Sequence, residues 1–352
     1  MSLDKRKVTI LKAIISSYID SAEAVGSRTI SKKYELGVSP ATIRNEMSDL
    51  EEMGFLVQPH TSSGRIPTDK AYRYYVDDLW KKVKTSKNPN FDQLRNIIED
   101  KSNELDEVFR NSVRILSQFT KYTSFIVAPQ LKQSVIKRVQ MVPVSDTKVL
   151  LLIILQTNVV KQVTLRLNST IPLDQMEKIS EALTEKMYGC KLEDIDKIKD
   201  SLIKELYYVR ESSNDALMEL LPYLVEQMLK LEEINVFSDG ITNILDLPEY
   251  NDVVKAREFI SFVEDKDSVV KLLQYASEDD LDICIGSENK NYELRDCSLI
   301  TATYKFNGKL IGKIGVIGPT RMNYSNVIST VKSISDAISE IINQNFNGES
   351  KE

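Results

Sequence analysis

From Gly26 to Tyr75 the chain reads GSRTISKKYELGVSPATIRNEMSDLEEMGFLVQPHTSSGRIPTDKAYRYY. This stretch predicts two short helices joined by a tight turn, then a strand and a polar hairpin. That order is the layout of a winged helix, a module that docks on duplex DNA. Ser39 can cap the second helix, and Pro40 suits its first position because the missing N–H would have no partner within the helix.

The second helix has an apolar face and a polar face. Ile43, Met47 and Leu50 recur at helical spacing, so they are predicted to face the core. At 100° per residue this turns other side chains outward: Ala41, Asn45 and Ser48 directly, with Thr42 and Arg44 on the flanks. Arginine can bind guanine, asparagine can bind adenine, and threonine or alanine can meet a thymine methyl. On spacing alone, a solvated helical hairpin or a protein-docking module is the alternative.

A polar loop follows the short apolar run from Phe55 to Val57. The loop reads QPHTSSGRIPT, and its prolines, glycine and hydroxyl side chains exclude a core element. Arg65 beside Gly64 is predicted to lie at the tip of this wing, where it would meet a phosphate or the minor groove. His60, the only histidine, is expected to help hold the shape of the hairpin, with a DNA contact or a pH sensor as the alternative.

Two blocks of this sequence resemble the heat-inducible transcription repressor family, HrcA. The first is SPATIRNEMSDLEEMGFLVQPHTSSGRIPTDKAYRYYVDDL, and the second is GKIGVIGPTRMNYSNVI, from Gly312 to Ile328. The resemblance implies a repressor that binds an inverted repeat upstream of chaperone operons. It also implies a GroEL-type chaperonin that keeps the repressor folded, a GAF-like domain, and an inserted dimerising domain.

The charge of the chain is unevenly distributed. Its 352 residues carry a net charge of −6, whereas the eleven basic and eleven acidic side chains of residues 1–80 cancel. This balance favours a few placed phosphate contacts over a broad basic surface, so two copies per DNA site are expected. The candidate DNA-contacting residues are Arg28, Thr29, Lys32, Ser39, Ala41, Thr42, Arg44, Asn45, Ser48, His60, Ser62, Ser63 and Arg65.

Composition argues against several other classes of protein. The three cysteines, Cys190, Cys284 and Cys297, are widely spaced and form no CxxC pair, so neither a metal nor another cofactor is expected. One histidine leaves little room for a His base, and an enzyme is not expected. No run of eighteen apolar residues is present, and the opening residues MSLDKRKVTI carry charge without a long apolar stretch, so secretion is not expected. We therefore expect a cytoplasmic protein without a membrane partner.

The fold class predicted for the whole chain is a multidomain α+β protein. A winged helix-turn-helix domain over 1–85 precedes a polar linker, and strand patterns over residues 123–167 and again after 280 indicate one split α+β domain. That domain, GAF-like by resemblance, is assigned to 86–188 and 281–346. A mainly helical insertion is assigned to 189–280. It carries an apolar stripe that is predicted to form a dimer surface; the alternative is that the stripe is the core of a helical subdomain. The stripe consists of Leu217, Leu220, Leu221, Leu224 and Met228.

The glycine-rich run IGKIGVIGPTR, from Ile311 to Arg321, lacks both standard nucleotide-binding spacings. We expect a strand and a turn here, with Arg321 tying domains together; a vestigial ligand pocket is the alternative. The leading function is a homodimeric repressor that binds double-stranded DNA at an inverted repeat and is modulated by chaperonin. A transcriptional regulator that senses a small molecule through the GAF-like domain is the second hypothesis.

Overall fold

The computed structural model describes most of the chain and divides it into two compact units. One unit comprises Met1–Ala128 with Val236–Gln344, and the other comprises Pro129–Asn235 with Asn345–Glu352. The residues described are 3–60, 63–83, 91–99, 105–128, 135–156, 160–167, 170–195, 197–198, 200–201, 204, 235–275 and 279–346. Among them, no helix has the length and apolar character needed to span a membrane.

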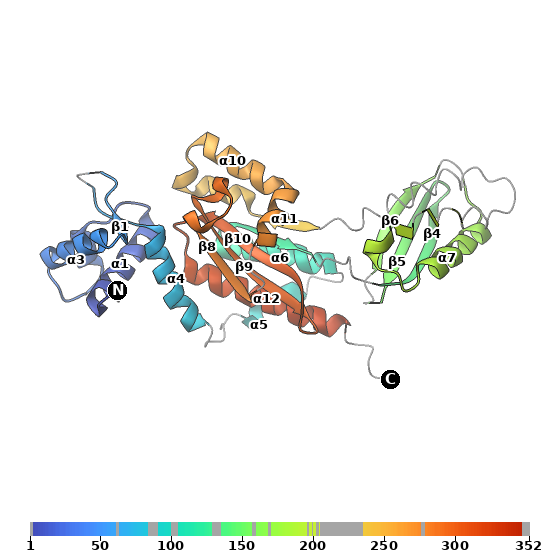
Figure 1. The fold of residues 1–352 in the computed structure, drawn as a ribbon, viewed down its shortest axis with the longest axis horizontal. Coiled ribbons are helices and arrows are strands. Elements are labelled where there is room, and N and C mark those ends of the chain that lie inside the picture. The colour runs from blue at the N-terminus through green and yellow to red at the C-terminus, as the bar shows by residue number, and fades with distance from the viewer. Residues whose placement is uncertain are drawn as a thin grey trace. The chain divides into compact units, whose positions relative to one another are not determined.

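The amino-terminal module is a bundle of three short helices with a two-stranded wing (Figure 1). Its elements are α1 (Lys5–Ser21), α2 (Ser27–Lys33), α3 (Pro40–Glu52), β1 (Leu56–Val57) and β2 (Ile66–Pro67). One fully buried cluster joins the three helices and consists of Leu11, Ile14, Ile30, Ile43 and Leu50. Burial of these side chains fixes which faces of α2 and α3 point outward.

The body of the same unit is built on a five-stranded antiparallel sheet. Its strand order is β7-β3-β10-β9-β8. The strands are β3 (Thr123–Val127), β7 (Val236–Asp239), β8 (Leu281–Ile285), β9 (Cys297–Phe306) and β10 (Lys309–Pro319). The helices are α4 (Asp69–Val83), α5 (Phe91–Glu99), α6 (Leu105–Thr120), α10 (Val253–Glu264), α11 (Lys266–Tyr275) and α12 (Tyr324–Phe346), with 3-10 turns η3 (Ile241–Asp246), η4 (Pro248–Tyr250), η5 (Gly286–Glu288) and η6 (Tyr292–Leu294).

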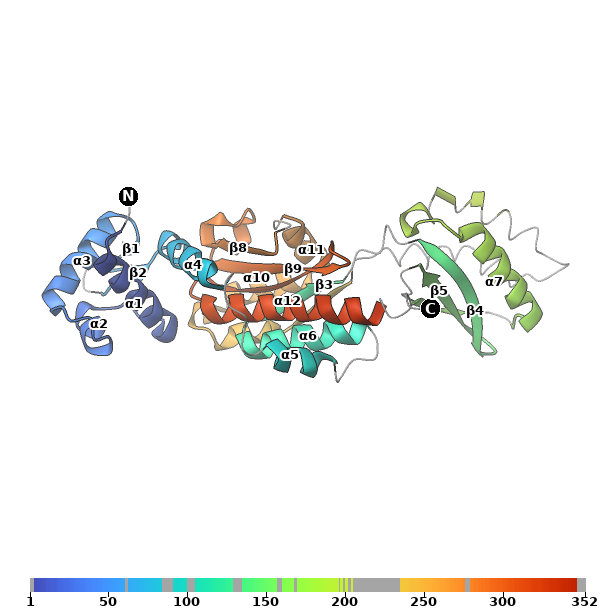
Figure 2. The same ribbon diagram turned by 90° about the horizontal axis from the view of Figure 1, so that it is seen from below.

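Alternation along β9 places helices on both faces of this sheet. Ser298 bonds to Tyr324 of α12, and Tyr304 stacks near Phe109 of α6, so α12 and α6 cover one face (Figure 2). Cys297 points to the opposite face, where its sulfur lies 3.3 Å from the Tyr250 hydroxyl beside α10. Strand β9 is therefore covered on both sides, which accounts for the burial of eight consecutive residues from Cys297 to Tyr304.

The second unit has its own small core. Its sheet runs in the order β4-β5-β6, and α7 packs against one face. The elements are β4 (Ile136–Ser145), β5 (Lys148–Leu155), β6 (Val160–Arg166), α7 (Leu173–Met187) and the 3-10 turn η2 (Leu192–Asp194). Alternate β5 residues and one stripe of α7 are buried. The hydroxyls of Ser180 and Thr184 on α7 accept hydrogen bonds from the backbone of β4, and Thr184 also donates one to it.

This division differs from the predicted domain boundaries. The insertion was placed at 189–280, whereas the compact units meet at Ala128/Pro129 and at Asn235/Val236. Strands β4 to β6 were assigned to the split domain but form a separate sheet within the second unit. Helices α10 and α11, predicted within the insertion, belong to the body. The physical reason is that alternation marks a strand but does not select the sheet in which it pairs.

Within the first unit, two contacts tie α1 and α4 to segments that come late in the sequence. Arg321 lies before α12 and donates to the carbonyl oxygen of Ile19 in α1 and to the Glu249 carboxylate. The predicted role of Arg321 as a tie is confirmed. A second contact joins α4 to η5, where the Asp69 carboxylate accepts bonds from the backbone N–H and the hydroxyl of Ser287, at 2.9 and 2.8 Å.

Candidate nucleic-acid interface

Helix α3 has the cap and the inner face predicted for it. The Ser39 hydroxyl accepts a hydrogen bond from the Thr42 N–H at 3.1 Å, and Pro40 occupies the first turn. Ile43, Met47 and Leu50 are buried. This local chemistry sets where the helix begins and how it is rotated, so the residues on its outer face are known.

The outer face of α3 presents a short row of exposed side chains. Ala41, Arg44, Asn45 and Ser48 are all exposed, as their spacing predicted. Thr42 is only half-buried, and its hydroxyl lies 2.9 Å from that of Ser39, so it belongs to the cap. A guanidinium and a carboxamide on one exposed helix face are the groups that best discriminate bases in a major groove.

Helix α2 contributes a second row beside α3. Arg28, Thr29 and Lys32 are exposed, and Ile30 points into the core. Lys33 differs from its neighbours because its ammonium pairs with Asp20 of α1 at 2.8 Å. In helix-turn-helix modules the helix before the recognition helix crosses the DNA backbone, and Arg28 and Lys32 could serve there as phosphate contacts.

Backbone pairing between β1 and β2 and the side chain of one serine hold the hairpin of the wing together. Leu56 pairs with Pro67 and Val57 with Ile66. The Ser63 hydroxyl donates to the His60 carbonyl at 2.7 Å and accepts from the His60 N–H at 3.0 Å. These bonds use the backbone of His60, whose side chain is exposed. Ser62 lies outside the described residues.

Arg65 does not lie at the tip of the wing as expected. It is at the base, where its backbone pairs with Val25 and its guanidinium forms an ion pair with Glu51 of α3 at 2.7 Å. Only 20% of its side chain is exposed. Gly64 explains the error: a Cβ there would lie 2.5 Å from the Val25 carbonyl, so the glycine serves a close approach of two backbones and does not mark the loop tip.

Sequence reasoning also missed an ion-pair group between α1 and α3. The Lys7 ammonium lies 2.7 Å from Glu46 and 2.9 Å from Asp49, and Arg6 lies 3.6 Å from Glu46. The hydrogen bond to Glu46 is the main reason that the pKa of Lys7 is raised above its ordinary value, and the hydrogen bond to Asp49 is the second. Lys7 and Glu46 are 39 positions apart, so no local pattern marks the pair.

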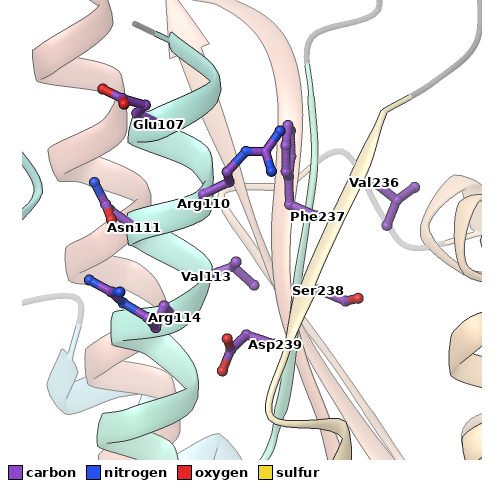
Figure 3. A pocket seen from close by; sticks show the side chains of 9 residues that line it. All are labelled: Glu107, Arg110, Asn111, Val113, Arg114, Val236, Phe237, Ser238 and Asp239. Carbon is purple, nitrogen blue, oxygen red and sulfur yellow. The ribbon is translucent and has the colours of Figure 1, made fainter. Parts of the chain in front are cut away.

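Away from this surface, the body contains a hollow of about 570 Å³ between α6 and β7 (Figure 3). Arg110 lies over the Phe237 ring, with 5.4 Å between the guanidinium carbon and the ring centroid. Arg114 and Asp239 also line the hollow. In the described part of the chain, no group of three His, Cys, Asp or Glu residues has the arrangement needed to hold a metal ion.

A capped helix with an exposed reading face, flanked by a second helix and a two-stranded wing, defines the winged helix-turn-helix class of DNA-binding modules. The comparisons agree: the model described as "Winged helix-turn-helix transcription repressor, HrcA DNA-binding" matches residues 2–77, and that for the HrcA protein C terminal domain matches residues 106–328. The chain belongs to the HrcA family. This family consists of transcription repressors and not of enzymes.

Relatives match over nearly the whole chain. The heat-inducible transcription repressor HrcA of Alkaliphilus metalliredigens is 40% identical over 344 residues, covering 97% of this chain and 98% of the relative. That of Clostridium tetani is 41% identical over 346 residues, covering 97% and 96%. A crystal structure described only as a hypothetical protein has the same fold, with a TM-score of 0.75, 22% identity, and coverage of 97% of this chain and 99% of that one.

Proposed function

We propose that this chain is a heat-inducible repressor that binds double-stranded DNA through α3 and the wing. The observation that carries the proposal is the exposed pair Arg44 and Asn45 on a helix held by a proline start, a serine cap and a buried inner face. Arg28 and Lys32 would contact phosphates beside them. Such a repressor works beside the chromosome, in the cytoplasm.

The proposed target is an inverted repeat read by a homodimer. A two-fold axis would bring two copies of α3 into major grooves separated by whole helical turns of about 34 Å each. The apolar stripe expected to form the dimer surface, from Leu217 to Met228, lies outside the described residues. Truncating Leu220 and Leu224 to alanine should yield monomers or aggregates in light scattering. A soluble, intact dimer would place the dimer surface elsewhere.

The proposed trigger is the supply of chaperonin. A marginally stable repressor that depends on a GroEL-type chaperonin would lose activity when heat diverts the chaperonin to unfolded clients. The deciding experiment is footprinting of the full-length chain on the promoter of a chaperone operon, with and without chaperonin and ATP. We expect protection of a dyad-symmetric segment that is stronger with chaperonin. Equal competition by a scrambled duplex would refute the proposal.

The hollow between α6 and β7 supports a second candidate, a regulator that senses a small molecule through a GAF-like body. Two guanidinium groups, from Arg110 and Arg114, line the hollow together with the carboxylates of Glu107 and Asp239. The guanidinium groups would bind the anionic group of a small polar ligand. A thermal-shift screen of carboxylate and phosphate metabolites would test it. A ligand at a hundredfold excess over its Kd adds about 2.7 kcal/mol, and Arg110→Ala should abolish that gain.

A further inference from the structure

The charge of helix α3 is unfavourable for a DNA-reading element. Between Pro40 and Glu52 it carries one basic residue, Arg44, against four carboxylates, Glu46, Asp49, Glu51 and Glu52. DNA presents one negative charge per about 1.7 Å of helix axis, so a helix with three excess negative charges would be repelled as it entered the groove. Something outside α3 has to offset these carboxylates.

Three of the four carboxylates are matched by cations from other elements. Lys7 of α1 binds Glu46 and Asp49 at 2.7 and 2.9 Å, and Arg65 binds Glu51 at 2.7 Å. Arg6 adds a longer contact of 3.6 Å to Glu46. Because Lys7 and Glu46 are only 18% and 12% exposed, this pairing is held between α1 and α3 and is less screened by salt than a free surface pair.

We propose that Lys7 is a positioning residue for DNA binding that acts by neutralising α3, with Arg65 in the same role at Glu51. Lys7 meets two carboxylates at once, so its ammonium is committed to the protein and not to a phosphate. The consequence is local: the charge of the α3 surface, not the charge of the whole chain, decides how closely the helix approaches DNA. The inference rests on the proposed function because it requires α3 to face the duplex.

The test compares Lys7→Met with Lys12→Met in the full-length chain. Lys12 also lies on α1 and forms an ion pair, 2.6 Å from Asp78 of α4, so the matched variant removes the same charge without touching α3. Binding is measured by fluorescence anisotropy on a short random-sequence duplex. At about 50 mM salt we expect Lys7→Met to bind about three- to tenfold more weakly, with the difference shrinking towards about 200 mM. Lys12→Met should stay within about twofold of the parent.

A charge rescue separates neutralisation from a purely structural role. The variant E46Q/D49N lacks the ion pairs yet removes the repulsion, so it should bind at least as tightly as the parent, and adding both changes to Lys7→Met should restore its affinity. Lys7→Arg should bind like the parent. If the ion pairs merely held the fold, E46Q/D49N would lose affinity as Lys7→Met does. If Lys7 itself contacted phosphate, the combined variant would remain weak.

These outcomes are distinguishable from failure of the proposed function. A parent chain that shows no preference for a dyad-symmetric duplex over a scrambled one refutes the proposed function before any variant is compared. A parent that discriminates, together with equal behaviour of Lys7→Met and Lys12→Met, refutes only the neutralisation. If Lys7→Met fails to fold, E46Q/D49N alone decides, because weaker binding by that variant overturns the inference.

Discussion

The guanidinium of Arg321 donates to the carboxylate of Glu249, with Nε and Oε1 2.6 Å apart. The same group donates to the carbonyl oxygen of Ile19 in α1, so one side chain joins the amino-terminal module to the body. Arg321 is 11% exposed, and Glu249 is 32% exposed. The contact is therefore partly shielded from water, unlike an ordinary surface pair.

Arg321→Ala should lower the free energy of unfolding by about 1–3 kcal/mol, because the carbonyl of Ile19 and the carboxylate of Glu249 lose their donor. Urea denaturation measures the loss, and hydrogen exchange should speed up at the end of α1. Lys332→Met is the matched control: its pair with Asp336 on α12 is 30% and 46% exposed, and its removal should cost less than about 0.5 kcal/mol. Equal losses of stability in the two variants would show that the contacts of Arg321 contribute no more to the free energy of unfolding than an ordinary surface ion pair.

Arg44→Ala and Asn45→Ala should each cost about 1–3 kcal/mol on the preferred DNA sequence and less on random DNA, since under the proposed function both side chains bind base edges. Competition binding at fixed salt measures both losses. Arg166→Ala, which removes an exposed guanidinium from β6, serves as the control and should leave discrimination unchanged. Losses of equal size on both DNAs would mean that a different face of α3 reads the bases.

Tyr72→Phe should leave stability unchanged or raise it by up to about 1 kcal/mol. The Tyr72 side chain is 2% exposed, its ring lies 5.6 Å from that of Tyr324, and its hydroxyl has no hydrogen-bond partner within the described residues. Removing an unsatisfied buried hydroxyl costs nothing in lost bonds. Thermal denaturation against the parent tests this expectation.

The control for Tyr72 is its own ring partner. The Tyr324 hydroxyl donates to the Thr320 carbonyl and lies against the Ser298 hydroxyl, both at 2.7 Å. Tyr324→Phe leaves these groups without a partner and should cost about 1–2 kcal/mol. If both variants lost stability equally, the hydroxyl of Tyr72 would have to be bonded in solution.

Gly286→Ala should destabilise the contact between α4 and η5. Gly286 has a φ of +52°, and a Cβ there would lie 2.5 Å from the carboxylate carbon of Asp69. Gly308 also has positive φ, +76°, but a Cβ there would meet no atom within 4 Å. Gly308→Ala therefore reports the backbone cost alone, about 1 kcal/mol. Gly286→Ala should lose more than this in urea denaturation, and a loss no greater would show that Asp69 moves aside freely.

Local patterns predicted the reading helix well. The cap at Ser39, the inner face at Ile43, Met47 and Leu50, and the exposure of Arg44 and Asn45 all follow from helical geometry within one short segment. The packing role of Tyr72 followed from the same spacing. Each of these properties depends on neighbours only a few positions away.

Contacts between distant residues were the ones that sequence patterns did not predict. Arg65 was expected at a loop tip because glycine usually marks a turn, whereas Gly64 lets the wing approach Val25. The strands β4 to β6 were expected to share a sheet with β3, yet they pair only with one another. Strand pairing and ion pairing depend on distances in space that sequence spacing does not encode.

The amino-acid sequence by itself determined the winged helix, the rotation of α3 and the groups that α3 presents, because helical periodicity and capping are set by residues within a few turns. Only the tertiary structure decided that Lys7 pairs with Glu46 and Asp49, that the partners of Arg321 are Ile19 and Glu249, and that the second compact unit begins at Pro129. The reason is physical: electrostatic and packing energies depend on proximity in the folded chain, and folding brings together residues separated by tens to hundreds of positions.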